Sequence, residues 1–194
     1  MNGIVSIRSF RDLPSILWGA LAPHSHLLQF YDDDVELLES LEAFVAEGLQ
    51  AGDGVIVIAT RAHGDGLRDR LMRGGVPLDK AIQDGSYLAL DADETLSWFM
   101  VDGWPDSQRF RQLMRRLVGH ARGDGRRVRA FGEMVVTLWT QGNVAAAMRL
   151  EQLWGEFCHE EDFALLCAYP LSGLVRGKGA MNQIIAEHSG LVAV

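Results

Sequence analysis

Several side chains with chemical potential stand at or near the ends of apolar, strand-like stretches of this sequence. Tyr31 ends one such stretch, and Glu133 closely follows another, which spans residues 127–131. In open α/β sheets, ligands bind beyond the carboxyl ends of the strands. We therefore expect Glu133 to bind or polarise a ligand there. The alternative role is to satisfy backbone N–H groups at the start of the next helix.

Aromatic and thioether side chains near the predicted strand ends suggest a small-molecule pocket. With few polar groups beside them they would line an apolar cavity, and ordinary core packing is the alternative for each one. The predicted ligand-binding residues are His26, Tyr31, Glu133, Met134, Cys167 and Tyr169, with further aromatic surface from Trp139 and Trp154. We predict no cofactor, and no catalytic residue, because no Ser or Cys stands in a nucleophile-elbow pattern.

The histidines and cysteines were weighed for metal and redox chemistry. His24 and His26 would share one face of a strand, but the sequence shows no third ligand at a useful spacing, so no metal site is predicted. His26 is interpreted as a hydrogen-bonding group of the sheet edge or the pocket. Cys167 lies inside an apolar strand and is interpreted as a small buried hydrophobe, with redox or electrophile sensing as the alternative.

The turn after residues 26–31 is where a nucleotide-binding α/β protein would carry a glycine-rich phosphate loop. This chain has Asp32, Asp33 and Asp34 there instead. Carboxylates at a helix N-terminus cap its free N–H groups, and three of them would repel a triphosphate. The pattern Gly-x-x-x-x-Gly-Lys-Ser/Thr occurs nowhere in the sequence. We interpret the turn as a degenerate phosphate loop.

These residues depend on an alternation of strands and helices for their positions. Apolar runs predict strands near residues 26–31, 55–59, 87–90, 127–131 and 163–169. Helical spacing of apolar residues predicts helices near 35–49, 60–72, 91–100, 105–122, 134–139, 144–157 and 180–188. Such alternation is typical of an α/β fold with a mainly parallel sheet and helices on both faces, in three layers.

Composition and charge narrow the classes of function. The 194 residues carry a formal net charge of −8, which argues against binding to nucleic acid or to an anionic membrane surface. No apolar run approaches the roughly 18 residues of a membrane span, and the N-terminus does not resemble a signal peptide. Cys158 and Cys167 are interpreted as free thiols. We therefore expect a cytoplasmic protein without membrane or nucleic-acid partners.

A series of short motifs, in order along the chain, resembles the MEDS domain, the sensory domain named for methanogen and methylotroph proteins and the dichloromethane-responsive regulator. The motifs are His26-x-x-x-Phe30-Tyr31, Phe44-x-x-x-Gly48-Leu49-x-x-Gly52-Asp53, Arg129-x-Phe131-Gly132-Glu133-Met134, Gly142-Asn143, Leu150-Glu151-x-x-Trp154, Leu166-Cys167-Ala168-Tyr169-Pro170 and Glu187-His188-Ser189. The order of elements also resembles a KaiC/RecA-type ATPase domain without its phosphate-binding loop. The resemblance divides the chain into an N-terminal extension, residues 1–22, and a sensory domain, residues 23–192.

The resemblance implies a signal-input module that senses small hydrocarbon derivatives. Such domains are usually joined to a histidine kinase, a PAS-type domain or a DNA-binding segment, and nothing in this sequence resembles a transmitter or a helix-turn-helix. We therefore expect an excised input domain, or a sensor that docks to a separate histidine kinase or other regulator. The N-terminal segment would pack on the domain or form the arm of a homodimer. The alternatives are a pure interaction module in a kinase or sigma-factor pathway, and a nucleotide-binding protein.

Overall fold

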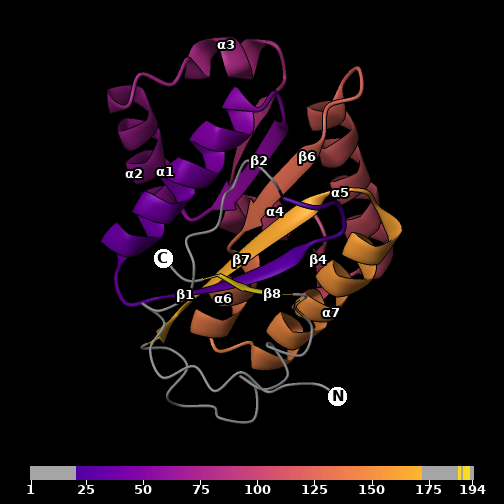
Figure 1. The fold of residues 1–194 in the computed structure, drawn as a ribbon. Helices are drawn as coiled ribbons and strands as arrows, with labels where there is room; N and C mark the ends of the chain where they lie inside the picture. Colours follow the sequence, from indigo (N-terminus) through magenta and orange to yellow (C-terminus); the bar gives the residue numbers. More distant parts are fainter. Residues whose placement is uncertain (1–20, 172–187, 189, 193–194) are drawn as a thin grey trace, which may run out of the picture.

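In the computed structural model, which describes residues 21–171, 188 and 190–192, a parallel sheet forms the centre of the domain (Figure 1). Its six strands lie in the order β3-β2-β6-β7-β1-β8. The strands are β1 (His26–Tyr31), β2 (Gly54–Ala59), β3 (Tyr87–Asp91), β6 (Val128–Gly132), β7 (Ala164–Pro170) and β8 (Gly190–Val192). Every pairing among them is parallel, which confirms the α/β prediction.

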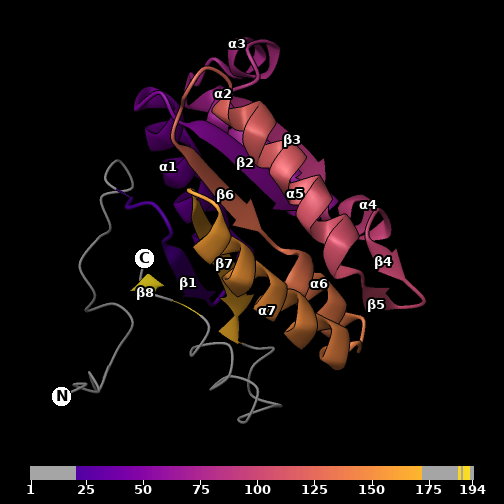
Figure 2. The same cartoon turned by 90° about the vertical axis from the view of Figure 1, so that its right-hand side faces the viewer.

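Helices cover both faces of the sheet and complete three layers (Figure 2). One face carries α1 (Asp34–Gln50), α2 (Arg61–Arg73) and α3 (Leu78–Gln83). The other face carries α4 (Ala92–Ser97), α5 (Ser107–Arg122), α6 (Met134–Thr140) and α7 (Val144–Glu160). No helix in the described part of the chain combines the length and the apolar character that a membrane crossing requires.

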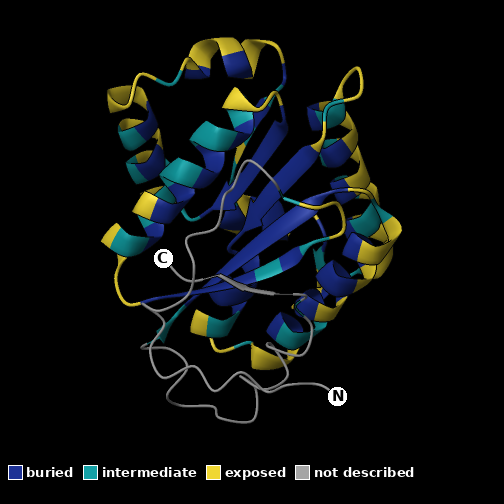
Figure 3. Cartoon of the chain, in the orientation of Figure 1, coloured by how far each residue is buried: buried dark blue, intermediate teal, exposed yellow. Residues whose placement is uncertain are grey.

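The strands β1, β2, β6 and β7 are buried almost throughout, as Figure 3 shows by their dark colour between helices with exposed outer sides. All six residues of β2 are buried, which explains why its sequence is a continuous apolar run rather than an alternating one. On the α5–α7 side, the ring of Phe110 meets Trp154 and Phe157 edge to face, at centroid distances of 4.9 and 6.0 Å. This aromatic packing fixes α7 against α5.

Several elements differ from the sequence prediction, among them the edge strand β8, which was not predicted. The helix predicted to run through residue 100 ends at Ser97, and a small antiparallel ribbon follows, formed by β4 (Met100–Val101) and β5 (Trp104–Pro105). The ribbon turns at Asp102 and Gly103, whose φ angles are both positive, at 50° and 76°. Two left-handed residues in succession suit a tight hairpin turn, so the local Asp-Gly pair ends the helical pattern. The short helix α3 was not predicted.

The acidic turn after β1 caps α1, as the sequence predicted. The side chain of Asp33 accepts a hydrogen bond from the backbone N–H of Glu36 at 3.0 Å. In return, the carboxylate of Glu36 accepts one from the N–H of Asp32 at 2.7 Å. Two N–H groups that a bound anion would otherwise contact are therefore already paired within the chain.

Two predictions concern parts of the chain that lie outside the described residues. The amphipathic segment near residues 10–18 is one, and the helix predicted over residues 180–188, apart from His188 itself, is the other. The division into residues 1–22 and 23–192 therefore stays a prediction.

Candidate functional site

At the carboxyl ends of β2 and β6, the chain leaves the sheet toward opposite faces. These strands are neighbours in the sheet, but the chain enters α2 on one face after β2 and α6 on the other face after β6. Such a divergence opens a crevice at the edge of a parallel sheet. Thr60 and Glu133 follow the two strands directly, so both face this crevice.

Glu133 is held at the crevice by Thr60 and His63, which follow the carboxyl end of the neighbouring strand β2. Its side chain is 3% exposed, and one carboxylate oxygen accepts a hydrogen bond from the N–H of Thr60 at 2.8 Å. The other oxygen is 2.5 Å from Nδ1 of His63. The hydrogen bond to Glu133 is the main reason why the pKa of His63 is raised above its ordinary value, and Asp34, 3.3 Å from Nε2, adds to the effect against the opposing cost of burial. His63 thus bridges two carboxylates.

The local sequence explains why His63 reaches this position. Thr60 caps α2, and its hydroxyl oxygen accepts a hydrogen bond from the N–H of His63 at 3.4 Å. This cap fixes the first turn of α2 beside the end of β2. His63 was not predicted as a site residue. Its place in the first turn of a predicted helix, directly after a predicted strand end, is the signal that would have found it.

A cavity of about 300 Å³ lies beside this pair, and we call it the carboxyl-edge pocket. Its lining is Tyr31, Asp32, Asp34, Thr60, His63, Glu133, Val136, Thr137, Thr140 and Pro170. Burial, followed by the negative charges of Glu133 and Asp34, raises the pKa of Tyr31, so its hydroxyl stays protonated and able to donate. The pocket therefore combines acidic and donating groups with apolar walls, and it has more polar groups than the sequence led us to expect.

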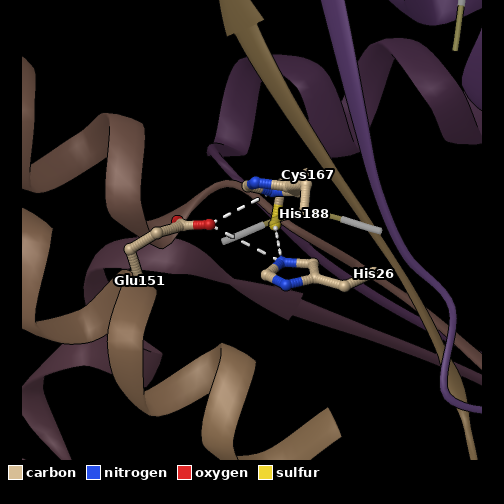
Figure 4. A group of neighbouring side chains, drawn as sticks. All are labelled: His26, Glu151, Cys167 and His188. Carbon is tan, nitrogen blue, oxygen red and sulfur yellow. Dashed lines mark hydrogen bonds and ion pairs between the residues drawn. The ribbon is translucent and has the colours of Figure 1, made fainter. Parts of the chain in front are cut away.

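A second group of polar side chains lies under α7, and we call it the buried cluster: His26, Glu151, Cys167, Tyr169 and His188. His26 of β1 and Cys167 of β7 lie on adjacent strands, with 3.5 Å between Nε2 and Sγ. Glu151 of α7 is fully buried, and one of its oxygens accepts a hydrogen bond from the Tyr169 hydroxyl at 2.6 Å. Figure 4 shows Glu151 facing the two histidines and the thiol.

The remaining contacts of the buried cluster also converge on Glu151. Its Oε1 atom lies 3.6 Å from Nε2 of His26 and 3.1 Å from Nε2 of His188. The two imidazole rings are in contact, with their centroids 3.9 Å apart and their planes tilted by 37°. Burial, with the charge of Glu151 as the next contribution, raises the pKa of the Cys167 thiol and of the Tyr169 hydroxyl well above their usual ranges.

The structure divides the six predicted ligand-binding residues between different surroundings. Tyr31 and Glu133 line the carboxyl-edge pocket, whereas His26, Cys167 and Tyr169 belong to the buried cluster. Met134 is fully buried in the core. The rings of Tyr31 and Tyr169 lie on opposite faces of the sheet, and the hydroxyl of Tyr169 reaches Glu151 of α7, so the two do not line one cavity. The assignment of the six residues to ligand binding stays a prediction.

The two histidines of the N-terminal motif also separate. His24 precedes β1 with a positive φ of 59°, and its Nδ1 lies 2.9 Å from the carbonyl oxygen of Cys158. The groups near His26 come from distant parts of the sequence, namely Glu151, Cys167 and His188. In the sequence, Glu151 and His188 stand out only within the motifs that resemble the MEDS domain, because nothing in their spacing places them beside His26.

Both groups of residues fall within one family match. The model of the MEDS family, described as the MEthanogen/methylotroph, DcmR Sensory domain, matches residues 25–188, which is most of the chain. The comparison with curated proteins found no match. On the strength of the family match, this chain belongs to the MEDS family of sensory domains.

Proposed function

We propose that this MEDS domain is a non-enzymatic input module of a bacterial signalling system that binds a small molecule in the carboxyl-edge pocket. The observation that carries the proposal is the position of Glu133. It is held by the amide of Thr60 and by His63 at the wall of a cavity of about 300 Å³, where α2 and α6 diverge. The sensory character of the family supports the same role.

The pocket suggests the chemistry of the ligand. Val136, Pro170 and the ring of Tyr31 offer apolar surface, while Glu133 and Asp34 accept hydrogen bonds or balance a positive charge. Small-molecule sites commonly combine apolar walls with a few fixed polar groups. We therefore propose a short hydrocarbon derivative that carries a hydroxyl or an amino group. Its polar end would contact Glu133 and its carbon chain would lie against Val136.

The signal would pass through contacts with another protein. A ligand in this pocket touches both α2 and the α6 side of the divergence, so it can favour one relative position of these helices over another. The region around the β4–β5 ribbon exposes Trp98, Val101 and Trp104, with exposed fractions of 45%, 38% and 48%. Exposed tryptophans are frequent anchors of protein interfaces, which favours docking to a histidine kinase or other regulator in the cytoplasm.

A ligand screen tests the proposal. Thermal unfolding of the full chain is measured with 1-propanol, 1,2-propanediol, ethylamine, dichloromethane and magnesium-ATP, and calorimetry follows any shift. We expect a small alcohol or amine to raise the Tm of the wild type and not of Glu133→Gln. Glu94→Gln, on the exposed first turn of α4, is the matched control and should respond like the wild type.

Two results would contradict the proposal. One is a ligand response that Glu133→Gln retains in full, which would place the ligand elsewhere. The other is stabilisation by magnesium-ATP alone, which would favour the nucleotide-binding alternative. If no small molecule shifts the Tm but a kinase or sigma-factor regulator binds the unliganded domain, the pure interaction module becomes the better description.

A further inference from the structure

The buried cluster has the composition and the spacing of a metal site. His26, Glu151, Cys167 and His188 each offer one ligand atom, and these four atoms lie within 4.8 Å of one another. They come from β1, from α7, from β7 and from the residue two positions before β8. We propose that these four residues bind one Zn²⁺ ion. This inference is independent of the ligand proposed for the carboxyl-edge pocket.

The distances between the ligand atoms fit a tetrahedral ion. Bonds of about 2.0–2.3 Å from a tetrahedral Zn²⁺ hold neighbouring ligand atoms about 3.3–3.6 Å apart. Nε2 of His26 lies 3.6 Å from Oε1 of Glu151 and 3.5 Å from Sγ of Cys167. Nε2 of His188 lies 3.1 Å from the same oxygen of Glu151. The remaining pairs of ligand atoms lie within 4.8 Å, so side-chain adjustments would bring all four atoms to bonding distance around one centre.

Charge and donor type point to the same ion. Imidazole nitrogen, thiolate sulfur and carboxylate oxygen are the three ligand types that Zn²⁺ accepts in proteins. A divalent ion with one thiolate and one carboxylate is electrically neutral, which suits a cluster whose side chains are almost entirely buried. Binding would displace the thiol proton of Cys167.

Tyr169 acts as a positioning residue for the carboxylate. Its hydroxyl donates to Oε2 of Glu151 at 2.6 Å, so that Oε1 is the oxygen turned toward both histidines (Figure 4). Hydrogen bonds of this kind orient metal ligands and are part of the design of a metal site. Four protein ligands would complete a tetrahedral shell, which is typical of structural rather than catalytic zinc.

The ion would tie the last strand to the domain. Three ligands belong to elements packed around the core, whereas His188 lies two positions before β8, which pairs with the outer side of β1. Zinc binding would therefore stabilise the attachment of this edge strand, and loss of zinc would loosen it.

Zinc content and cobalt spectra test the site. The full chain is produced in zinc-supplemented medium and its metal content is measured, and a second preparation is loaded with Co²⁺. We expect close to one zinc per chain, and with Co²⁺ a thiolate charge-transfer band together with the strong visible absorption of a four-coordinate ion. Cys167→Ala should lose the band and most of the zinc. Cys158→Ala is the matched control, since both cysteines are 1% exposed, and it should keep both signals.

His188→Ala provides a second variant in case Cys167→Ala does not fold. It should lower zinc content while keeping the far-ultraviolet circular dichroism of the wild type. In the wild type, removal of zinc by a chelator should lower the Tm, and in Cys167→Ala the chelator should have no effect. The proposal is overturned if the folded wild type takes up no zinc and no Co²⁺, or if the charge-transfer band follows Cys158 instead of Cys167.

Discussion

The two ends of the strand pair β2–β6 carry the same kind of group, a buried carboxylate paired with a basic side chain, in opposite settings. At the amino-terminal end, Asp53 pairs with Arg129. At the carboxyl-terminal end, Glu133 pairs with His63. Asp53 and Glu133 are buried to a similar degree, at 4% and 3% exposure. Burial alone therefore does not distinguish a structural acid from a candidate ligand-binding one.

The partners of the two carboxylates make the difference. Asp53 is enclosed by cations, because Nε of Arg129 and Nε of Arg127 each donate to it at 3.0 Å. Arg129 also donates to the carbonyl oxygen of Phe44 at 3.2 Å and lies over its ring. Glu133 has a titratable partner, His63, and a cavity beside it. The Asp53–Arg129 pair is permanently charged and fully hydrogen-bonded, which is typical of a group that stabilises the fold. The Glu133–His63 pair can titrate and lies beside a pocket, which is typical of a ligand-binding group.

The largest expected effect is at the amino-terminal pair. Asp53→Ala leaves the buried guanidinium of Arg129 without its counter-charge, and removing one partner of a buried ion pair costs about 3–5 kcal/mol of unfolding free energy. Chemical denaturation measures this loss. Asp124→Ala, at an exposed turn next to the same strand, should change stability by less than about 0.5 kcal/mol. Equal effects of the two substitutions would show that the Asp53–Arg129 pair has no structural role.

A second substitution tests how tightly Arg129 is fitted. A Cβ atom at Gly48 would lie 2.7 Å from Cδ and 2.8 Å from Nε of Arg129. We expect Gly48→Ala to destabilise the domain by about 1–3 kcal/mol through overpacking. Gly64→Ala is the matched control in α2, where a Cβ would meet nothing within 4 Å, so it should be neutral or slightly stabilising. A neutral result for Gly48→Ala would mean that Arg129 can move aside at no cost.

At the carboxyl-terminal pair we expect a smaller effect on stability and a larger one on binding. Glu133→Gln keeps an oxygen that can accept from the Thr60 amide but loses the charge opposite His63. The expected loss is about 0.5–1.5 kcal/mol by thermal or chemical unfolding. If Glu133→Gln lowered the unfolding free energy as much as Asp53→Ala, Glu133 would contribute to stability as strongly as Asp53. The proposed difference in role between the two carboxylates would then be wrong.

The smallest expected effect is the pH dependence of the stability that the Glu133–His63 pair contributes. Because Glu133 raises the pKa of His63 above its ordinary value of about 6.5, the folded state favours the protonated imidazole. The resulting stabilisation is fully present below that ordinary value and is lost as the pH rises through the raised pKa. Solvent near the pocket keeps it under about 1 kcal/mol.

Two measurements check the pH prediction. Titration of His63 by nuclear magnetic resonance should show a pKa above the ordinary value in the wild type and a lower pKa in Glu133→Gln. The stability difference between the wild type and His63→Gln should shrink as the pH increases. A difference that grows with pH would mean that the pair is stabilised by the neutral imidazole instead.

Much of the fold was predictable because it depends on local patterns. The continuous apolar run of β2 and the helical spacing of apolar residues after it predicted a parallel strand followed by a helix, and both are present. The order of the strands was not predictable, because it depends on which apolar faces pack together. The ribbon of β4 and β5 was missed because two positive φ angles at Asp102 and Gly103 override a helical pattern that continues to residue 100.

The candidate sites were predictable only in part. Glu133 and Tyr31 were found because they stand at strand ends, a property that the sequence displays directly. Glu151 and His188 are separated from His26 by more than a hundred residues, and only tertiary packing brings the three side chains together. Local spacing rules for metal ligands do not detect a site assembled in this way. The RecA-like ancestry of the fold stays a prediction.

The reciprocal hydrogen bonds among Asp32, Asp33 and Glu36 have a consequence for protein engineering. A designer who wished to give this domain a nucleotide cradle would gain little from a single added lysine. The turn would first have to lose its own carboxylates, gain glycines for a closer backbone approach and acquire a different path into α1. Such a change requires a new loop, so a short series of point substitutions would leave intact the cap that closes this end of the helix.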